Sequence, residues 1–256
     1  GIGDIKGVID KLDYVEYMGF NGIWFMPLMP SPSYHKYDVV DYYGIDEQYG
    51  SMEDFDKLVE ECHNRGINVI IDFVINHSSS EHPWFTQACE YLKTLAPGEE
   101  PDLSVCPYVD YYHFAKEKET SLCYEIEGTE WYYEGAFWSG MPDLNLQSEA
   151  LRKEIEDIAK FWIDKGVDGF RMDVINYISK EPGLPKGNEA IGNLMGYPGI
   201  EKYYYGPRLH EFLREIQEKA FTPHEAFSVG ETPGLGMKMC QLVTGEERKE
   251  LDMVFS

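Results

Sequence analysis

Two carboxylates and an arginine stand near the ends of short apolar segments, Arg171 and Asp173 in one segment and Glu231 in the next. Retaining cleavage of a glycosidic bond requires one carboxylate that attacks the anomeric carbon and a second carboxyl that protonates the leaving oxygen. The three residues therefore predict a hydrolase with two catalytic carboxylates. Two alternatives stay open. One is an Arg171–Asp173 ion pair that only stabilises the fold. The other is metal-assisted hydrolysis, for which His77 is the single well-placed candidate ligand.

The elements that carry these residues follow from hydrophobic periodicity. Apolar residues at helical spacing alternate with short continuous apolar runs, which is typical of a parallel sheet covered by helices. Because the carboxyl ends of parallel strands meet at one face, we expect the polar residues to gather there. The predicted helices are 5–18, 51–66, 148–166 and 209–216, and the predicted strands are 22–26, 68–75, 167–174, 227–231 and 251–256.

Two stretches interrupt this alternation. Residues 78–147 contain no long periodic pattern and are rich in Tyr, Trp, Pro and Gly. They far exceed the roughly 12–15 residues of an ordinary connection, which predicts an inserted subdomain. Residues 179–206 contain many Gly and Pro residues and predict a long loop on the same side as the strand ends.

Composition narrows the class of partner. The 22 basic and 46 acidic residues give a net charge of −24, which would repel nucleic acid and anionic membranes. No apolar run approaches the roughly 18 residues of a membrane span. An aromatic content of 14% suits a neutral sugar, although core packing accounts for most aromatic side chains. Five widely spaced cysteines without a CxxC pair predict free thiols and a cytoplasmic location.

Four segments resemble, in order and spacing, conserved blocks of the α-amylase family, glycoside hydrolase family 13. They are Asp72–His77, Met141–Asn145, Gly169–Asp173 and Gly230–Glu231. The resemblance implies an α/β fold built on a (β/α)8 TIM barrel. It assigns residues 1–77 to the first part of barrel domain A, residues 78–147 to domain B, inserted after the third barrel strand, and residues 148–256 to the continued barrel.

The same resemblance implies that the barrel is incomplete here. The first strand of the family would precede Gly1, and its last two strands and third catalytic Asp would lie beyond Ser256. We therefore expect a fragment of a longer enzyme, inactive alone because its active site lacks that residue.

By resemblance, Asp173 is the nucleophile and Glu231 the general acid/base, and Arg171 orients Asp173 and keeps it ionised. We expect a bell-shaped dependence of rate on pH, with ionised Asp173 setting the acid limb and protonated Glu231 the alkaline limb.

Further family roles fall on residues that would bind the sugar. His77 would bind its 6-hydroxyl, Asp38 its 4- and 6-hydroxyls, and Tyr37 would stack on the ring. Asp72 and Asn76 are interpreted as structural supports.

Asp4 is the candidate metal ligand. The segment Gly1–Asp4 resembles the end of a calcium-binding first loop of the family, and the alternative is that Asp4 simply caps a helix. We expect no cofactor for the chemistry, and a structural calcium ion remains the one candidate.

Substrate preference gives conflicting signals. Val174 resembles the oligo-1,6-glucosidase and α-glucosidase branch, whereas Tyr34–Asp38 and Met141 look more like bacterial α-amylases. We favour exo-acting cleavage of α-1,6 and α-1,4 gluco-oligosaccharides, because Val174 would lie beside the cleaved bond. The alternatives are an endo-acting α-amylase, a glucosyl transferase or isomerase, and a non-catalytic member of the transporter heavy-chain type.

Overall fold

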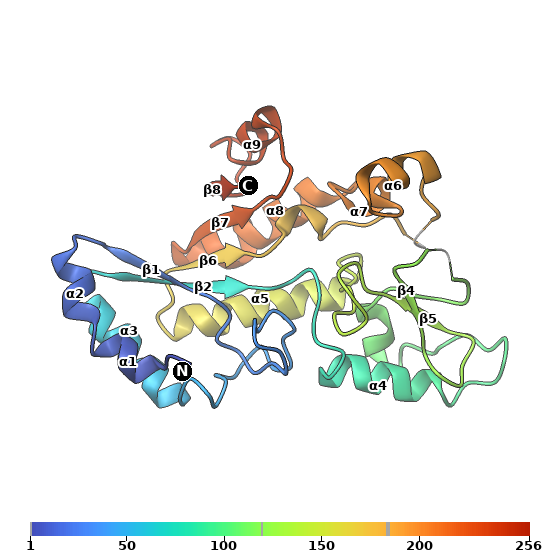
Figure 1. Ribbon diagram of the computed structural model, residues 1–256, viewed down its shortest axis with the longest axis horizontal. Helices are drawn as coiled ribbons and strands as arrows, with labels where there is room; N and C mark the ends of the chain where they lie inside the picture. The colour runs from blue at the N-terminus through green and yellow to red at the C-terminus, as the bar shows by residue number, and fades with distance from the viewer. Residues whose placement is uncertain (1, 119, 183–184) are drawn as a thin grey trace.

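The computed structural model describes residues 2–118, 120–182 and 185–256. Its centre is a parallel sheet with the strand order β1-β2-β6-β7-β8 (Figure 1). The strands are β1 Gly22–Phe25, β2 Asn68–Phe73, β6 Gly169–Met172, β7 Phe227–Glu231 and β8 Met253–Phe255. Each strand therefore pairs with the next strand of the sheet along the chain. This sequential order is that of part of a (β/α)8 barrel, as predicted.

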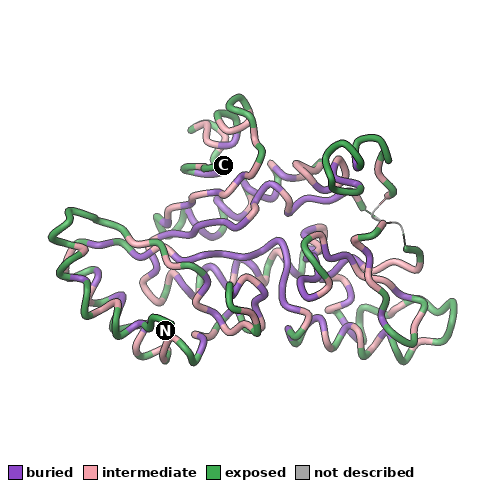
Figure 2. Tube along the Cα trace, in the orientation of Figure 1, coloured by how far each residue is buried: buried purple, intermediate pink, exposed green. Residues whose placement is uncertain are grey.

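Helices connect the strands and cover the sheet. They are α1 Ile5–Ile9, α2 Leu12–Tyr17, α3 Met52–His63, α5 Glu149–Asp164, α8 Leu209–Ile216 and α9 Met237–Val243, with the short turns η2 Ile175–Tyr177, η3 Gln217–Phe221 and η4 Thr222–His224. Every residue of β6 is buried, and Figure 2 shows the buried trace running through the central strands. Phe55 of α3 and Trp162 of α5 pack edge to face, with ring centroids 5.3 Å apart. No helix in the described part of the chain is long and apolar enough to cross a membrane.

Serine caps fix the starts of two helices. Ser51 accepts from the Asp54 backbone N–H at 3.2 Å, and Asp54 accepts from the Ser51 N–H at 3.0 Å, which completes the capping box of α3. Ser148 caps α5 by accepting from the Leu151 N–H at 3.3 Å. Gly166 follows α5 with φ of 91°, a left-handed conformation that glycine adopts without strain.

Two predicted boundaries were wrong. The helix predicted over 5–18 divides into α1 and α2, because only Ile5 and Leu12 of these two helices are buried and Gly7 weakens the first helix. The loop predicted over 179–206 contains two short helices, α6 Glu189–Met195 and α7 Ile200–Tyr203. Of the glycines that suggested a loop, Gly196 ends α6 and Gly199 precedes α7, whereas Gly192 lies inside α6.

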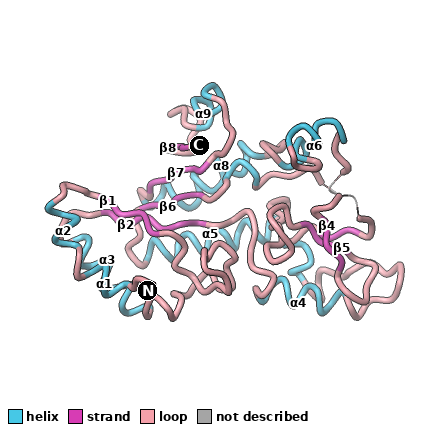
Figure 3. Tube along the Cα trace, viewed as in Figure 1, coloured by secondary structure: helices cyan, strands magenta, loops and turns pink. Residues whose placement is uncertain are grey.

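The stretch 78–147 forms its own helix and sheet. Helix α4 Pro83–Leu92 buries an apolar face that the sequence analysis missed, and η1 Pro107–Tyr111 follows it. A small antiparallel sheet, set apart from the main sheet in Figure 3, has the order β3-β5-β4. Its strands are β3 Phe114–Ala115, β4 Cys123–Glu125 and β5 Tyr132–Glu134. The exact limits of domain B stay a prediction.

Lys180 ties this stretch to the main sheet. Its buried Nζ donates to Asn76 Oδ1 and to the Tyr177 carbonyl, both at 2.9 Å, and lies 3.6 Å from Asp143 Oδ2. Asn76 follows β2, whereas Asp143 belongs to the inserted stretch and is fully buried. One ammonium group therefore serves partners from both parts of the fold.

We predict that Lys180→Met lowers the free energy of unfolding by about 3–5 kcal/mol, because it leaves the Asp143 carboxylate buried without a counter-charge. Urea denaturation of the natural protein measures the change. The matched control is Lys153→Met, whose side chain is 60% exposed in its pair with Asp157 and should cost about 0.5 kcal/mol or less. Equal stability of the two variants would contradict the structural role of Lys180.

Candidate active site

Three neighbouring strands bring the predicted catalytic residues together. Asp72 on β2 lies beside Arg171 on β6, and Glu231 ends β7, the next strand. The cavity at these strand ends has a volume of about 300 Å³. Its lining residues are His35, Tyr37, His77, Phe137, Met141, Arg171, Asp173, Val174 and Glu231.

Arg171 is the hub of this arrangement. Its Nη1 donates to Asp72 Oδ1 at 2.8 Å and to Asp173 Oδ1 at 2.7 Å, and its Nη2 lies 2.7 Å from Glu231 Oε2. The guanidinium carbon lies 5.0 Å from the ring centroid of Trp24, within cation–π range. A single buried cation therefore joins three carboxylates and fixes the two predicted catalytic groups relative to each other.

Asp72 contributes more than the structural support predicted from the sequence. It accepts two hydrogen bonds from Arg171, one from the Tyr37 hydroxyl at 3.1 Å and one from the Trp24 indole N–H at 3.3 Å. Burial raises the pKa of Asp72 to about 6, although the Arg171 charge lowers it. The pairing was detectable in principle, because Asp72 and Arg171 occupy matching places on adjacent strands.

The protonation state expected for Asp173 requires a correction. Burial raises the pKa of Asp173 well above its ordinary value, and the charges of Asp72 and Glu231 raise it further. Arg171 lowers the pKa of Asp173, as predicted, but does not outweigh burial. Asp173 therefore keeps its proton up to a pH at which an isolated Asp has lost it.

Val174 contacts Glu231, the predicted acid/base residue, through its backbone. Its N–H donates to Glu231 Oε2 at 3.1 Å. It adopts φ of 36° and ψ of 45°, a left-handed conformation that is strained for a β-branched residue. Family resemblance associates Val174 with specificity, but this contact depends on the fold and has no signal in the sequence.

His77 reaches the cavity as a neutral ring. Lys180 donates to Asn76 Oδ1, so Asn76 presents its Nδ2 donor to His77 Nδ1 at 3.2 Å. The His77 proton therefore sits on Nε2, which hydrogen bonds to none of the described residues. Burial, followed by the Lys180 charge, lowers the pKa of His77 to about 3. A neutral donor of this kind suits a sugar hydroxyl.

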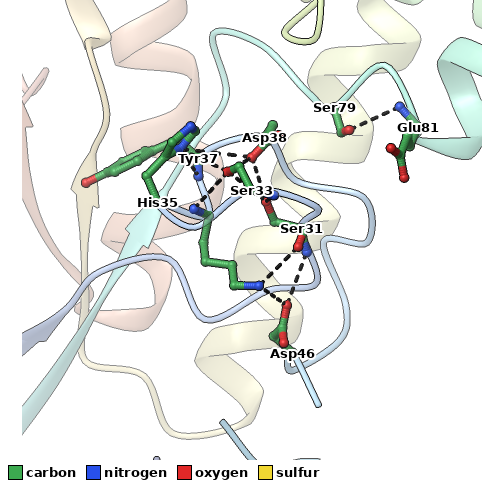
Figure 4. A network of polar contacts seen from close by, with 9 residues as sticks. Ser31, Ser33, His35, Tyr37, Asp38, Asp46, Ser79 and Glu81 are labelled. Atoms are coloured by element: carbon green, nitrogen blue, oxygen red, sulfur yellow. Dashed lines mark hydrogen bonds and ion pairs between the residues drawn. The ribbon is translucent and has the colours of Figure 1, made fainter. Parts of the chain in front are cut away.

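Tyr37 lines the cavity, but the neighbouring Asp38 does not. Asp38 is buried, and its Oδ1 accepts from the hydroxyls of Ser31, at 2.6 Å, and Ser33 (Figure 4). No described residue donates a hydrogen bond to its Oδ2. The sugar-binding role of Asp38 stays a prediction, and it would require this second oxygen.

Asp4 lies outside the cavity and caps α1 by accepting from the Gly7 N–H at 2.7 Å. Among residues 2–118, 120–182 and 185–256, no three His, Cys, Asp or Glu side chains form a metal-binding group. Calcium takes six to eight oxygen ligands, so the described surroundings of Asp4 do not fit a calcium ion without further donors. The calcium site stays an untested prediction.

Comparisons with known proteins agree with this geometry. A family model described as the catalytic domain of α-amylase matches residues 1–256. The chain belongs to the α-amylase family.

Several members of the family cover most or all of the chain. It is 40% identical to an oligo-1,6-glucosidase of Parageobacillus thermoglucosidasius, over 100% of this chain and 45% of the relative. It is 45% identical to alpha-amylase 3 of Dictyoglomus thermophilum, over 69% of this chain and 33% of the relative. A structure of trehalulose synthase superposes with a TM-score of 0.88 at 36% identity, over 100% of this chain and 45% of that one. The chain thus spans less than half the length of these relatives.

We predict that Arg171→Lys lowers kcat/KM roughly hundredfold, because a lysine ammonium replaces the guanidinium fork with one point charge. Without the Arg171 hydrogen bond, the pKa of Asp173 rises further, so the acid limb of the pH–rate profile moves to higher pH. Initial rates across the pH range measure both effects. The control is Arg152→Lys, which changes an Arg152–Glu215 pair outside the cavity. An unchanged acid limb would argue against control of Asp173 by Arg171.

Proposed function

We propose that this chain carries the catalytic carboxylates of a retaining α-glucoside hydrolase. The main support is that Asp173 and Glu231 contact the same guanidinium. Each carboxyl has an oxygen 2.7 Å from a nitrogen of Arg171. Retention requires the two carboxyls to be about 5–5.5 Å apart, and a shared guanidinium suits that short separation.

The steps follow from the positions of these groups. The Asp173 carboxylate attacks the anomeric carbon while the Glu231 carboxyl gives its proton to the leaving oxygen, which forms a covalent glucosyl–enzyme. Glu231, now ionised, then takes a proton from water as that water attacks the same carbon. Asp173 leaves as a carboxylate, and the product keeps the α configuration. The 27% exposure of the Glu231 side chain gives water access to it.

The substrates we propose are short α-1,6 and α-1,4 gluco-oligosaccharides, cleaved from the nonreducing end. The relative named oligo-1,6-glucosidase and the position of Val174 in the cavity support this choice. The relative named alpha-amylase 3 supports the alternative, an endo-acting α-amylase. An isomerase would use the same intermediate with a different acceptor, and the likeness to trehalulose synthase keeps that alternative open.

A non-catalytic family member is disfavoured, because Arg171, Asp173 and Glu231 are all present and in contact. Neither nucleic acid nor a membrane is a proposed partner, given the net charge of −24. We propose a cytoplasmic location, for which the five free cysteines are the support.

We predict that Asp173→Asn abolishes turnover of p-nitrophenyl α-glucoside and that Glu231→Gln lowers turnover roughly 10²–10⁴-fold. Proton NMR of the first product from the unmodified protein should show the α anomer. The control Glu225→Gln changes an exposed carboxylate just before β7 and should leave the rate unchanged. Full activity of either catalytic variant, or a β product, would rule out these assignments.

We predict that the natural protein releases glucose from isomaltotriose from the earliest time points, because an exo-acting α-1,6 site accepts that trisaccharide end-on. Product time courses from isomaltotriose and, separately, from maltohexaose measure this preference. Maltose and maltotriose from maltohexaose, with isomaltotriose untouched, would instead identify an α-amylase.

A further inference from the structure

His35 lines the catalytic cavity beside Tyr37 without an assigned role. The loop that carries both residues is anchored by Lys36, whose ammonium lies 2.7 Å from Asp46 and donates to the Ser31 carbonyl at 3.1 Å. Lys36 adopts φ of 67°, and the rings of His35 and Tyr37 on either side of it stack with centroids 6.0 Å apart. The loop thus presents the two rings together.

The hydrogen bonds of His35 determine where its proton lies. The Tyr37 backbone N–H donates to His35 Nδ1 at 3.1 Å, so Nδ1 must be an unprotonated acceptor. Ser33 Oγ lies 3.2 Å from the same nitrogen but gives its one proton to Asp38, so it does not compete as a donor. The neutral ring therefore carries its proton on Nε2.

The Nε2–H group of His35 is free for a ligand. It hydrogen bonds to no residue in the described ranges, and the His35 side chain is 44% exposed. His35 and the buried His77 both line the cavity, but only the His35 ring is also exposed to solvent.

The contacts of Tyr37 place His35 relative to the cleaved bond. His35 stacks on Tyr37, and Arg171 Nη1 donates to the Tyr37 hydroxyl at 3.2 Å and to Asp173 at 2.7 Å, whereas Glu231 lies 2.7 Å from Nη2. Glu231 protonates the leaving oxygen, so the leaving sugar lies on its side of the cavity. The sugar that becomes bonded to Asp173, the glycone, therefore extends toward His35.

We propose that His35 is a specificity-determining residue that donates its Nε2–H to an oxygen of the glycone sugar. The inference rests on the proposed α-glucoside hydrolase function and deepens it, because it names a residue that recognises the glycone by a hydrogen bond. A donor at this place favours a glycone with an oxygen there over the corresponding deoxy sugar.

The test compares p-nitrophenyl α-glucopyranoside with its 2-, 3-, 4- and 6-deoxy analogues in the natural protein. The variant His35→Phe keeps an aromatic ring against Tyr37 and removes the donor. It should raise KM for the parent glycoside roughly three- to tenfold, the worth of one neutral hydrogen bond. One deoxy analogue that binds poorly to the unmodified protein should show no such penalty in the variant. His35→Gln, which can still donate, should restore most of the discrimination.

The control is Tyr34→Phe, which changes an exposed neighbour outside the cavity lining. KM does not depend on the folded fraction, so partial misfolding of His35→Phe does not imitate the effect. KM values in His35→Phe equal to those of the unmodified protein for all five glycosides would overturn the proposal. So would an equal penalty for every deoxy analogue in both proteins.

Calorimetric binding of 1-deoxynojirimycin, which is shaped like glucose and has no leaving group, separates the two proposals. Binding that weakens in His35→Phe, in a protein that cleaves no α-glucoside, would support the His35 contact and overturn the hydrolase. Cleavage with equal binding in both proteins would support the hydrolase and overturn the His35 contact.

Discussion

The ion-pair cluster around Arg171 is the interaction on which the rest of the site depends. A carboxylate inside a barrel costs several kcal/mol unless it is paired. Here one guanidinium contacts Asp72, Asp173 and Glu231, so a single positive charge meets three acidic groups. Burial raises the pKa values of Asp72 and Asp173 in spite of this positive charge. Retaining glycoside cleavage needs a proton on one of its two carboxyls.

This cluster exists because three strands run parallel and in register. Asp72 is the register partner of Arg171, and Gly230, just before Glu231, is the partner of Met172. A shift of one residue in either pairing would turn the side chains to the opposite face of the sheet. The strained backbone of Val174 lies at the same place, where its N–H donates to Glu231.

The inserted stretch is linked to the site through Asp143, which lies 3.6 Å from the Lys180 ammonium. The ammonium of Lys180 orients the Asn76 amide, and the amide sets which nitrogen of His77 carries the proton. A contact between two parts of the fold is thereby transmitted to a group that lines the cavity. The position of the proton on His35 is set within its own loop, because the Tyr37 backbone N–H donates to His35 Nδ1.

The sequence was sufficient for those features that depend on neighbouring residues. Hydrophobic periodicity predicted the alternation of helices and strands, Ser51 and Ser148 marked helix starts, and the two candidate catalytic carboxylates stood out at strand ends. Only the tertiary structure decided features that depend on distant groups. They include the contact of Asp72 with Arg171, the direction of the Asp173 pKa, the link from Val174 to Glu231 and the position of His35 in the cavity. Desolvation and charge–charge interactions act through space between segments far apart in the chain, so neither periodicity nor spacing along the sequence could reveal them.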